Sequence, residues 1–108
     1  MAAVATTLGR LRALESLYAQ GYADEVVDLT VHKLLEHQVR KDEAQLAQLR
    51  TDLTRFEQRY AMSSADFFRR YQAGQMGDDA DVFEWNALYK MYTRLADAVE
   101  VLRRQLRE

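Results

Sequence analysis

The chain has 108 residues, the length of one ordinary domain, and we expect residues 1–108 to form a single helical domain. It contains no proline, no cysteine and only four glycines, which excludes disulfides, thiol chemistry and most structural zinc sites and favours helices over hairpins. Fifteen basic and 17 acidic residues give a formal net charge of -2, so the chain has no overall attraction to nucleic acid or to an anionic membrane.

The first predicted helix runs from Thr7 to Gln20, with Thr7 as its N-cap and Gly21 as a left-handed stop. It is short and amphipathic. Its apolar stripe consists of Leu8, Leu11, Leu14, Leu17 and Tyr18.

The second predicted helix begins at about Asp24, a capping residue, and continues to Tyr60 without any glycine or proline. At about 1.5 Å per residue it is roughly 50 to 55 Å long, too long to be covered by one compact core. Its apolar positions alternate in steps of four and three, a heptad seam in which Asp42 occupies one slot. At Asp42 we expect that the seam opens to water or that a basic side chain reaches the carboxylate. The apolar seam positions are Leu35, Val39, Leu46, Leu49, Leu53, Phe56 and Tyr60.

A complete helix-start pattern then begins the third predicted helix. Ser63 is its N-cap, Asp66 reaches back from the third position, and Met62 packs on Phe67 as a hydrophobic staple. The helix is short, and Gly74 caps its end.

The fourth predicted helix opens with Asp78, Asp79 and Asp81, where the helix dipole favours acidic residues, and runs almost to the last residue. Its apolar seam has the same period as the seam of the second helix, so the two should pair. The predicted fold is therefore all-α: a long antiparallel helical hairpin, coiled-coil-like, with short helices at the N-terminus and at the hairpin tip. The seam positions are Trp85, Leu88, Tyr92, Leu95, Val99, Leu102 and Leu106.

The residues give no indication of an enzyme, a metal site or a cofactor site. His32, Glu36 and His37 lie close together, but zinc-binding helices place two histidines four residues apart, and five residues turn the second ring off that face. The acidic turn, which we define as Asp78, Asp79, Asp81 and Glu84, lacks the glycine and the terminal glutamate of a calcium loop. It also has no nearby nucleophile or histidine, so we expect a non-enzymatic protein without cofactors.

The acidic turn has two interpretations: capping acids at a helix N-terminus, or a patch that faces a partner together with Phe83. On the helix, Phe83 and Val101 lie away from the seam, so both are expected to face outward. A DNA-binding helix-turn-helix would place the fourth helix in a phosphate-lined groove, where these carboxylates would be repelled. Direct DNA binding is therefore not expected.

Self-association is expected at the beginning of the long helix. Val26 and Leu29 lie far around that helix from Leu35 and Val39, which leaves two apolar faces where the hairpin covers only one. A second copy related by a two-fold axis is the commonest way to cover the surplus, so we predict a homodimer.

No apolar run approaches the roughly 20 residues that a membrane span needs, and the beginning of the chain lacks the pattern of an export signal. We expect a soluble, cytoplasmic protein that makes no contact with a membrane.

Two segments carry a resemblance to a known group: LYAQGYADEVVDLTVHKLL (17–35) and FEQRYAMSSADFFRRYQAGQMGDDADVFEWNALYKMYTRL (56–95). They resemble small helical proteins, frequent in cyanobacteria and related bacteria, that are encoded beside short toxin genes and are treated as antitoxins. The resemblance implies an antitoxin that neutralises its toxin by direct binding, and it transfers no catalytic residue. We expect the partner to be a small basic toxin, and a neighbouring gene for a small, basic, RNase-like protein would favour this function. The main alternative is a coiled-coil structural or adaptor protein that acts as a homodimer without a toxin partner. A transcriptional regulator is a more distant alternative.

Overall fold

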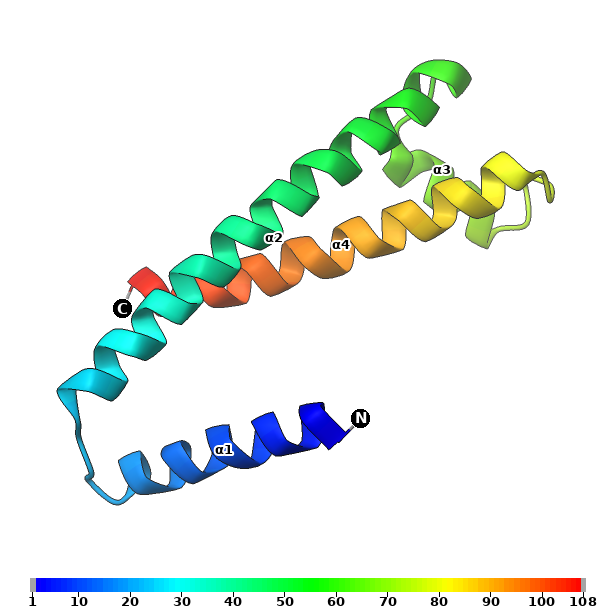
Figure 1. Cartoon of the computed structure of the whole chain (residues 1–108). Coiled ribbons are helices and arrows are strands. Elements are labelled where there is room, and N and C mark those ends of the chain that lie inside the picture. The colour runs from blue at the N-terminus through cyan, green and yellow to red at the C-terminus, as the bar shows by residue number, and fades with distance from the viewer. Residues whose placement is uncertain (1, 108) are drawn as a thin grey trace. The chain divides into compact units, whose positions relative to one another are not determined.

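The computed structural model describes residues 2–107, which form four helices: α1 (Ala2–Ala19), α2 (Glu25–Tyr60), α3 (Ser64–Gln72) and α4 (Ala80–Arg107) (Figure 1). The described residues include no strand, so the all-α prediction is confirmed. None of these helices combines the length and the apolarity needed to cross a membrane. The chain divides into two compact units, residues 1–34 and residues 35–108.

In the first unit, the prediction that Thr7 caps the first helix is wrong. Helix α1 already includes Ala2, and the Thr7 hydroxyl donates a hydrogen bond to the carbonyl of Ala3 (2.9 Å) inside the helix. The sequence before Thr7 is rich in alanine, the best helix former, so the helix extends through the position where a cap was expected.

The predicted end of the first helix is confirmed. Gly21 has a φ of 94°, its N–H donates to the carbonyl of Tyr18 (3.0 Å), and the N–H of Tyr22 donates to the carbonyl of Leu17 (3.0 Å). This pair of bonds is the Schellman motif, which satisfies the last carbonyls of the helix and requires the left-handed conformation that glycine adopts without strain.

Asp24 caps the start of α2, as predicted. Its Oδ1 accepts hydrogen bonds from the N–H groups of Val26 (2.8 Å) and Val27 (3.2 Å). The Tyr18 hydroxyl donates to Asp28 Oδ1 (2.7 Å), which raises the pKa of Tyr18 and ties the end of α1 to the first turn of α2.

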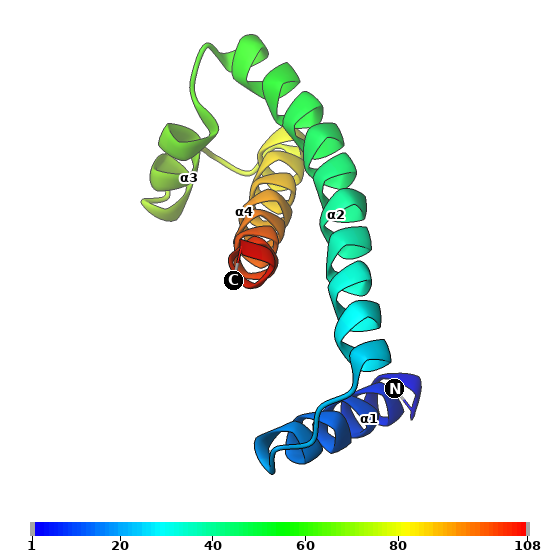
Figure 2. The same cartoon turned by 90° about the vertical axis from the view of Figure 1, so that its left-hand side faces the viewer.

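In the second unit, α2 from Leu35 onward and α4 run side by side in opposite directions. Arg59 near the end of α2 pairs with Asp81 at the start of α4, whereas Arg103 near the end of α4 pairs with Glu43. Every predicted seam position of α4 is buried or half-buried, while Tyr60, the last predicted position of α2, is 37% exposed. Figure 2 shows α4 lying between α2 and α3. The buried apolar residues of the two long helices are Val39, Leu49, Leu53, Phe56, Val82, Trp85 and Val99.

Both alternatives predicted for Asp42 are wrong. Asp42 is only 7% exposed, so the seam does not open to water there. Its Oδ1 accepts a hydrogen bond from the Gln38 side-chain amide (2.8 Å), one turn earlier on the same helix, rather than from a basic side chain. A neutral amide on the same helix thus satisfies a carboxylate that the seam covers.

Helix α2 ends in a left-handed residue that is not glycine. Ala61 has a φ of 51°, and the N–H of Met62 donates to the carbonyl of Glu57 (3.1 Å), the long bond of a Schellman ending. An alanine in this conformation is strained by its Cβ, so the end of α2 retains a small local cost.

Helix α3 begins and ends as predicted. The Ser63 hydroxyl oxygen accepts a hydrogen bond from the N–H of Asp66 (3.1 Å), and Gly74 closes the helix with a φ of 73°. Met62 packs on the apolar cluster that contains Phe67. The carboxylate of Asp66 differs from the prediction, because it pairs with Arg69 one turn later.

Candidate partner-binding site

The start of α4 is anchored on a stack of aromatic rings. Trp85 is fully buried, and its ring centroid lies 3.9 Å from that of Phe67 on α3, 5.6 Å from that of Phe56 and 5.5 Å from that of Tyr60 on α2. Stacked rings at these distances contribute beyond the area that they bury. The first turns of α4 are therefore held rigidly against both neighbouring helices.

A polar chain supports this aromatic stack. The Trp85 indole N–H donates to the buried Ser64 Oγ (2.9 Å), and the backbone N–H of Ser64 donates to Glu57 Oε2 (2.9 Å). Arg50 pairs with the other oxygen of Glu57. Burial acts to raise the pKa of Glu57, but the hydrogen bonds from Ser64 and the Arg50 charge outweigh it, so this pKa is lowered.

Sequence reasoning missed the roles of Ser64, Glu57 and Arg50. The available signal was a second serine directly after the helix cap, in a chain with a single tryptophan whose N–H requires an acceptor when it is buried.

Within the acidic turn, Asp81 is hydrogen-bonded to α2, whereas the carboxylates of Asp78, Asp79 and Glu84 are exposed. Asp81 accepts hydrogen bonds from Arg59 Nη1 (2.7 Å) and from the Tyr60 hydroxyl (2.7 Å), and the tyrosine bond, followed by the arginine, lowers the pKa of Asp81. Asp78 and Asp79 precede the helix and are exposed. Within the acidic turn, Asp81 therefore fastens α4 to α2, while the first two carboxylates face solvent.

The backbone of Asp79 begins α4. Its carbonyl accepts the N–H groups of Val82 (3.0 Å) and Phe83 (3.2 Å). Phe83 is 55% exposed and Val101 is 57% exposed, so the prediction that both face outward is confirmed. The exposed ring of Phe83 follows Asp79 by four residues, whereas Val82 and Trp85 on the same helix are buried.

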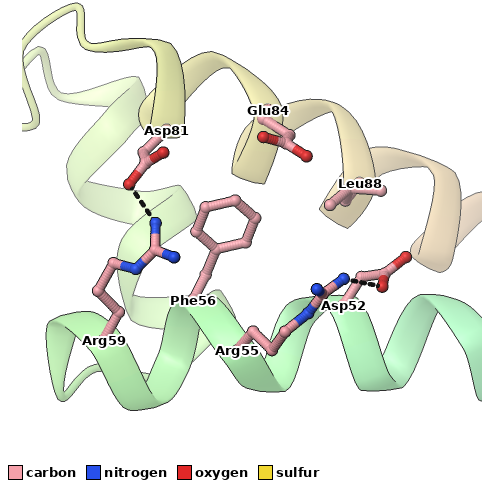
Figure 3. A pocket seen from close by; sticks show the side chains of 7 residues that line it. All are labelled: Asp52, Arg55, Phe56, Arg59, Asp81, Glu84 and Leu88. Atoms are coloured by element: carbon pink, nitrogen blue, oxygen red, sulfur yellow. Dashed lines mark hydrogen bonds and ion pairs between the residues drawn. The ribbon is translucent and has the colours of Figure 1, made fainter.

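A groove of about 210 Å³ lies between α2 and α4 beside the acidic turn (Figure 3). Its two arginines are already paired, Arg55 with Asp52 (2.5 Å) and Arg59 with Asp81 (2.7 Å). Glu84 projects from α4 over the groove, and within residues 3–107 it makes no hydrogen bond or ion pair. The groove therefore presents one free carboxylate among paired charges, and Phe56 and Leu88 are its apolar lining residues. Its lining consists of Asp52, Arg55, Phe56, Arg59, Asp81, Glu84 and Leu88.

The predicted self-association residues lie in the first unit. Val26 is 73% exposed and Leu29 is 53% exposed, so both are accessible. Across the described residues, no group of three or more histidine, aspartate or glutamate side chains is arranged to hold a metal ion.

Comparisons with known proteins give no further assignment: no family model, no curated protein and no solved structure matches this chain.

Proposed function

We propose that this chain is the antitoxin of a toxin–antitoxin pair, which neutralises a small, basic toxin by direct binding through the acidic turn and Phe83. One observation carries the proposal: the start of α4 exposes the carboxylates of Asp78 and Asp79, the ring of Phe83 (55% exposed) and, next to it in the sequence, the unpaired Glu84. The antitoxin resemblance of residues 17–35 and 56–95 supports the same function.

Charge explains why such a surface suits a toxin that acts on RNA. A protein that cleaves or modifies RNA needs a basic cleft that binds phosphate, and a compact group of carboxylates can occupy that cleft in place of the substrate. Opposite charges also raise the rate of association through steering. Phe83 supplies the aromatic anchor that commonly dominates binding energy at such surfaces.

The rigidity of the helix start favours affinity. Trp85 and the pair between Asp81 and Arg59 hold this part of α4 before any partner arrives, so little ordering remains to oppose binding. In this proposal Asp81 acts as a positioning residue, and the other members of the acidic turn contact the partner.

The alternative function is a structural or adaptor protein of coiled-coil type that works as a homodimer without a toxin. The exposure of Val26 and Leu29 favours this alternative, because a second copy could cover both apolar side chains. The genome separates the two functions: a neighbouring gene for a small, basic, RNase-like protein supports the antitoxin, and an isolated gene supports the adaptor.

Co-expression with the adjoining reading frame, followed by pull-down and a growth-rescue assay, tests the proposal. The informative change is Asp78→Ala with Asp79→Ala, and Asp97→Ala is the matched control because Asp97 is an exposed acid farther along α4. We expect the double variant to fold, to bind the toxin more weakly and with less dependence on salt, and to rescue growth poorly.

Helix capping is the competing account of the two aspartates. Capping alone predicts a loss of stability of roughly 0.5 to 2 kcal/mol with unchanged affinity once the protein is folded. A double variant that melts earlier yet binds the purified toxin with the same affinity and salt dependence would exclude the contact role of Asp78 and Asp79.

A further inference from the structure

Within residues 3–34 of the first unit, no side chain is buried. Among residues 3–34, only Leu14, Tyr18, Asp24 and Val27 are even half-buried. Nine large apolar residues in this segment are 40% to 73% exposed, whereas residues 35–107, a segment more than twice as long, contain only three in that range. The nine are Val4, Leu8, Leu11, Leu17, Tyr22, Val26, Leu29, Val31 and Leu34.

Helix α1 has the composition of a covered helix. The charged residues among its 18 positions are Arg10, Arg12 and Glu15. Its apolar and small residues are distributed around the whole circumference, so the predicted single apolar stripe is wrong. A helix that is apolar on all sides is normally buried in an assembly. Thus α1 needs a partner surface that the described contacts within its own unit do not provide.

The charge of this unit indicates what covers it. Arg10, Arg12 and Lys33 are balanced by Glu15, Asp24, Glu25 and Asp28, so the segment carries both signs in nearly equal number. A strongly basic partner, as proposed for the acidic turn, would gain nothing from this surface, whereas a surface of mixed charge can complement a second copy of itself.

The exposed area is also the right size for such a contact. A fully exposed large apolar side chain has an accessible area on the order of 100 to 200 Å². At the exposed fractions given above, the nine side chains together expose roughly 500 to 900 Å². A standard interface buries about 800 Å² per partner.

We infer that residues 3–34 are a dimerisation module: α1 and the first turns of α2 pack against the same segment of a second copy across a two-fold axis. Four helical segments, two from each copy, then enclose a shared apolar core. The module extends the contact beyond Val26 and Leu29 to α1. It rests on the exposure of the first unit and does not depend on the proposed toxin contact in the second.

Sedimentation of the full chain at tens of micromolar tests this inference. The variant Leu11→Glu with Val26→Glu places charges in the module, and Met91→Glu with Val101→Glu is its matched control, since both control residues are exposed apolar positions of α4. We expect a dimer for the unmodified chain and for the control. For the module variant we expect dimer affinity to fall by about tenfold or more.

Folding is checked in the same samples. Helical circular dichroism and the fluorescence of Trp85, the only tryptophan, report whether the rest of the chain is intact. Leu8→Ala with Leu11→Ala removes apolar area while keeping helix propensity, and should also weaken the dimer if α1 lies in the interface.

Three results would overturn the module: a monomeric unmodified chain, dissociation of the control rather than the module variants, or an alanine variant that dimerises as tightly as the unmodified chain. Association of a monomeric chain with anionic vesicles, or coverage of α1 by the toxin alone, would also contradict it. A dimer that fails to bind the toxin would instead remove only the proposed function.

Discussion

Replacing Ser64 by alanine removes the acceptor of the buried Trp85 indole N–H, the contact that joins α3 to α4 across 21 residues of sequence. A buried donor left without a partner costs about 1 to 3 kcal/mol. Glu57 loses the Ser64 side chain as a partner in this variant but keeps its bonds from the Ser64 backbone N–H and from Arg50. We therefore expect the free energy of unfolding to fall by about 1 to 3 kcal/mol, with a melting temperature lowered by roughly 4 to 8 °C for each kcal/mol in a domain of this size.

Urea unfolding followed by circular dichroism gives the stability change, and the denaturant slope should stay constant because the same surface is exposed. Ser63→Ala is the control: it removes the exposed helix cap and costs a similar amount, about 0.5 to 2 kcal/mol. Hydrogen exchange at the single indole N–H separates the two, since it should accelerate relative to the unmodified chain in Ser64→Ala and stay slow in Ser63→Ala. An indole that exchanges as slowly in Ser64→Ala as in the unmodified chain, with a stability loss below about 0.5 kcal/mol, would refute the role assigned to Ser64.

Three further changes test the fold. The pKa of Glu57 is lowered in the folded chain, so its carboxylate stabilises the fold at pH values above the ordinary pKa of 4.5, and this stabilisation is lost as the pH falls through the folded-state pKa. Glu57→Gln should therefore flatten the acid side of a plot of unfolding free energy against pH. An unchanged plot would contradict this role of Glu57. Ala61→Gly should stabilise the chain by about 0.5 to 1 kcal/mol, because glycine adopts the left-handed conformation without strain. The control Ala44→Gly, at an exposed position inside α2, should destabilise the chain by about 1 kcal/mol. A loss of stability in both variants would show that Ala61 is not strained. Asp42→Leu should raise the melting temperature while loosening oligomer state or helix alignment, because it replaces a buried carboxylate held by a single amide from Gln38; a lower melting temperature would mean that the polar pair is needed.

The helix boundaries that depend on local chemistry were predictable from the sequence. Gly21 and Gly74 end helices, and Asp24 and Ser63 begin them, because caps form between residues that lie within one turn of each other. Thr7 is the exception, since the same side chain can bond backward inside a helix when strong helix formers precede it.

The contacts that hold the candidate site could not be predicted in the same way. The bonds from Trp85 to Ser64 and from Arg59 to Asp81 join residues 21 and 22 positions apart, and which side chains meet depends on how α2, α3 and α4 pack. Periodicity placed Trp85 in the seam but carries no information about the acceptor of its N–H. The acidic turn was visible as a run of carboxylates, whereas the pairing of Asp81 required the position of α2.

A calorimetric titration of the full chain with the purified protein from the adjoining reading frame tests most directly the proposal that the start of α4 binds a toxin. Phe83→Ala is the decisive variant, and Val101→Ala, an equally exposed apolar position on the same helix, is its control. We predict saturable binding that weakens as salt rises, that falls by about tenfold or more in Phe83→Ala, as for an aromatic hot spot, and that is unchanged in Val101→Ala. An absence of binding, or equal affinities of the two variants, would contradict the proposal.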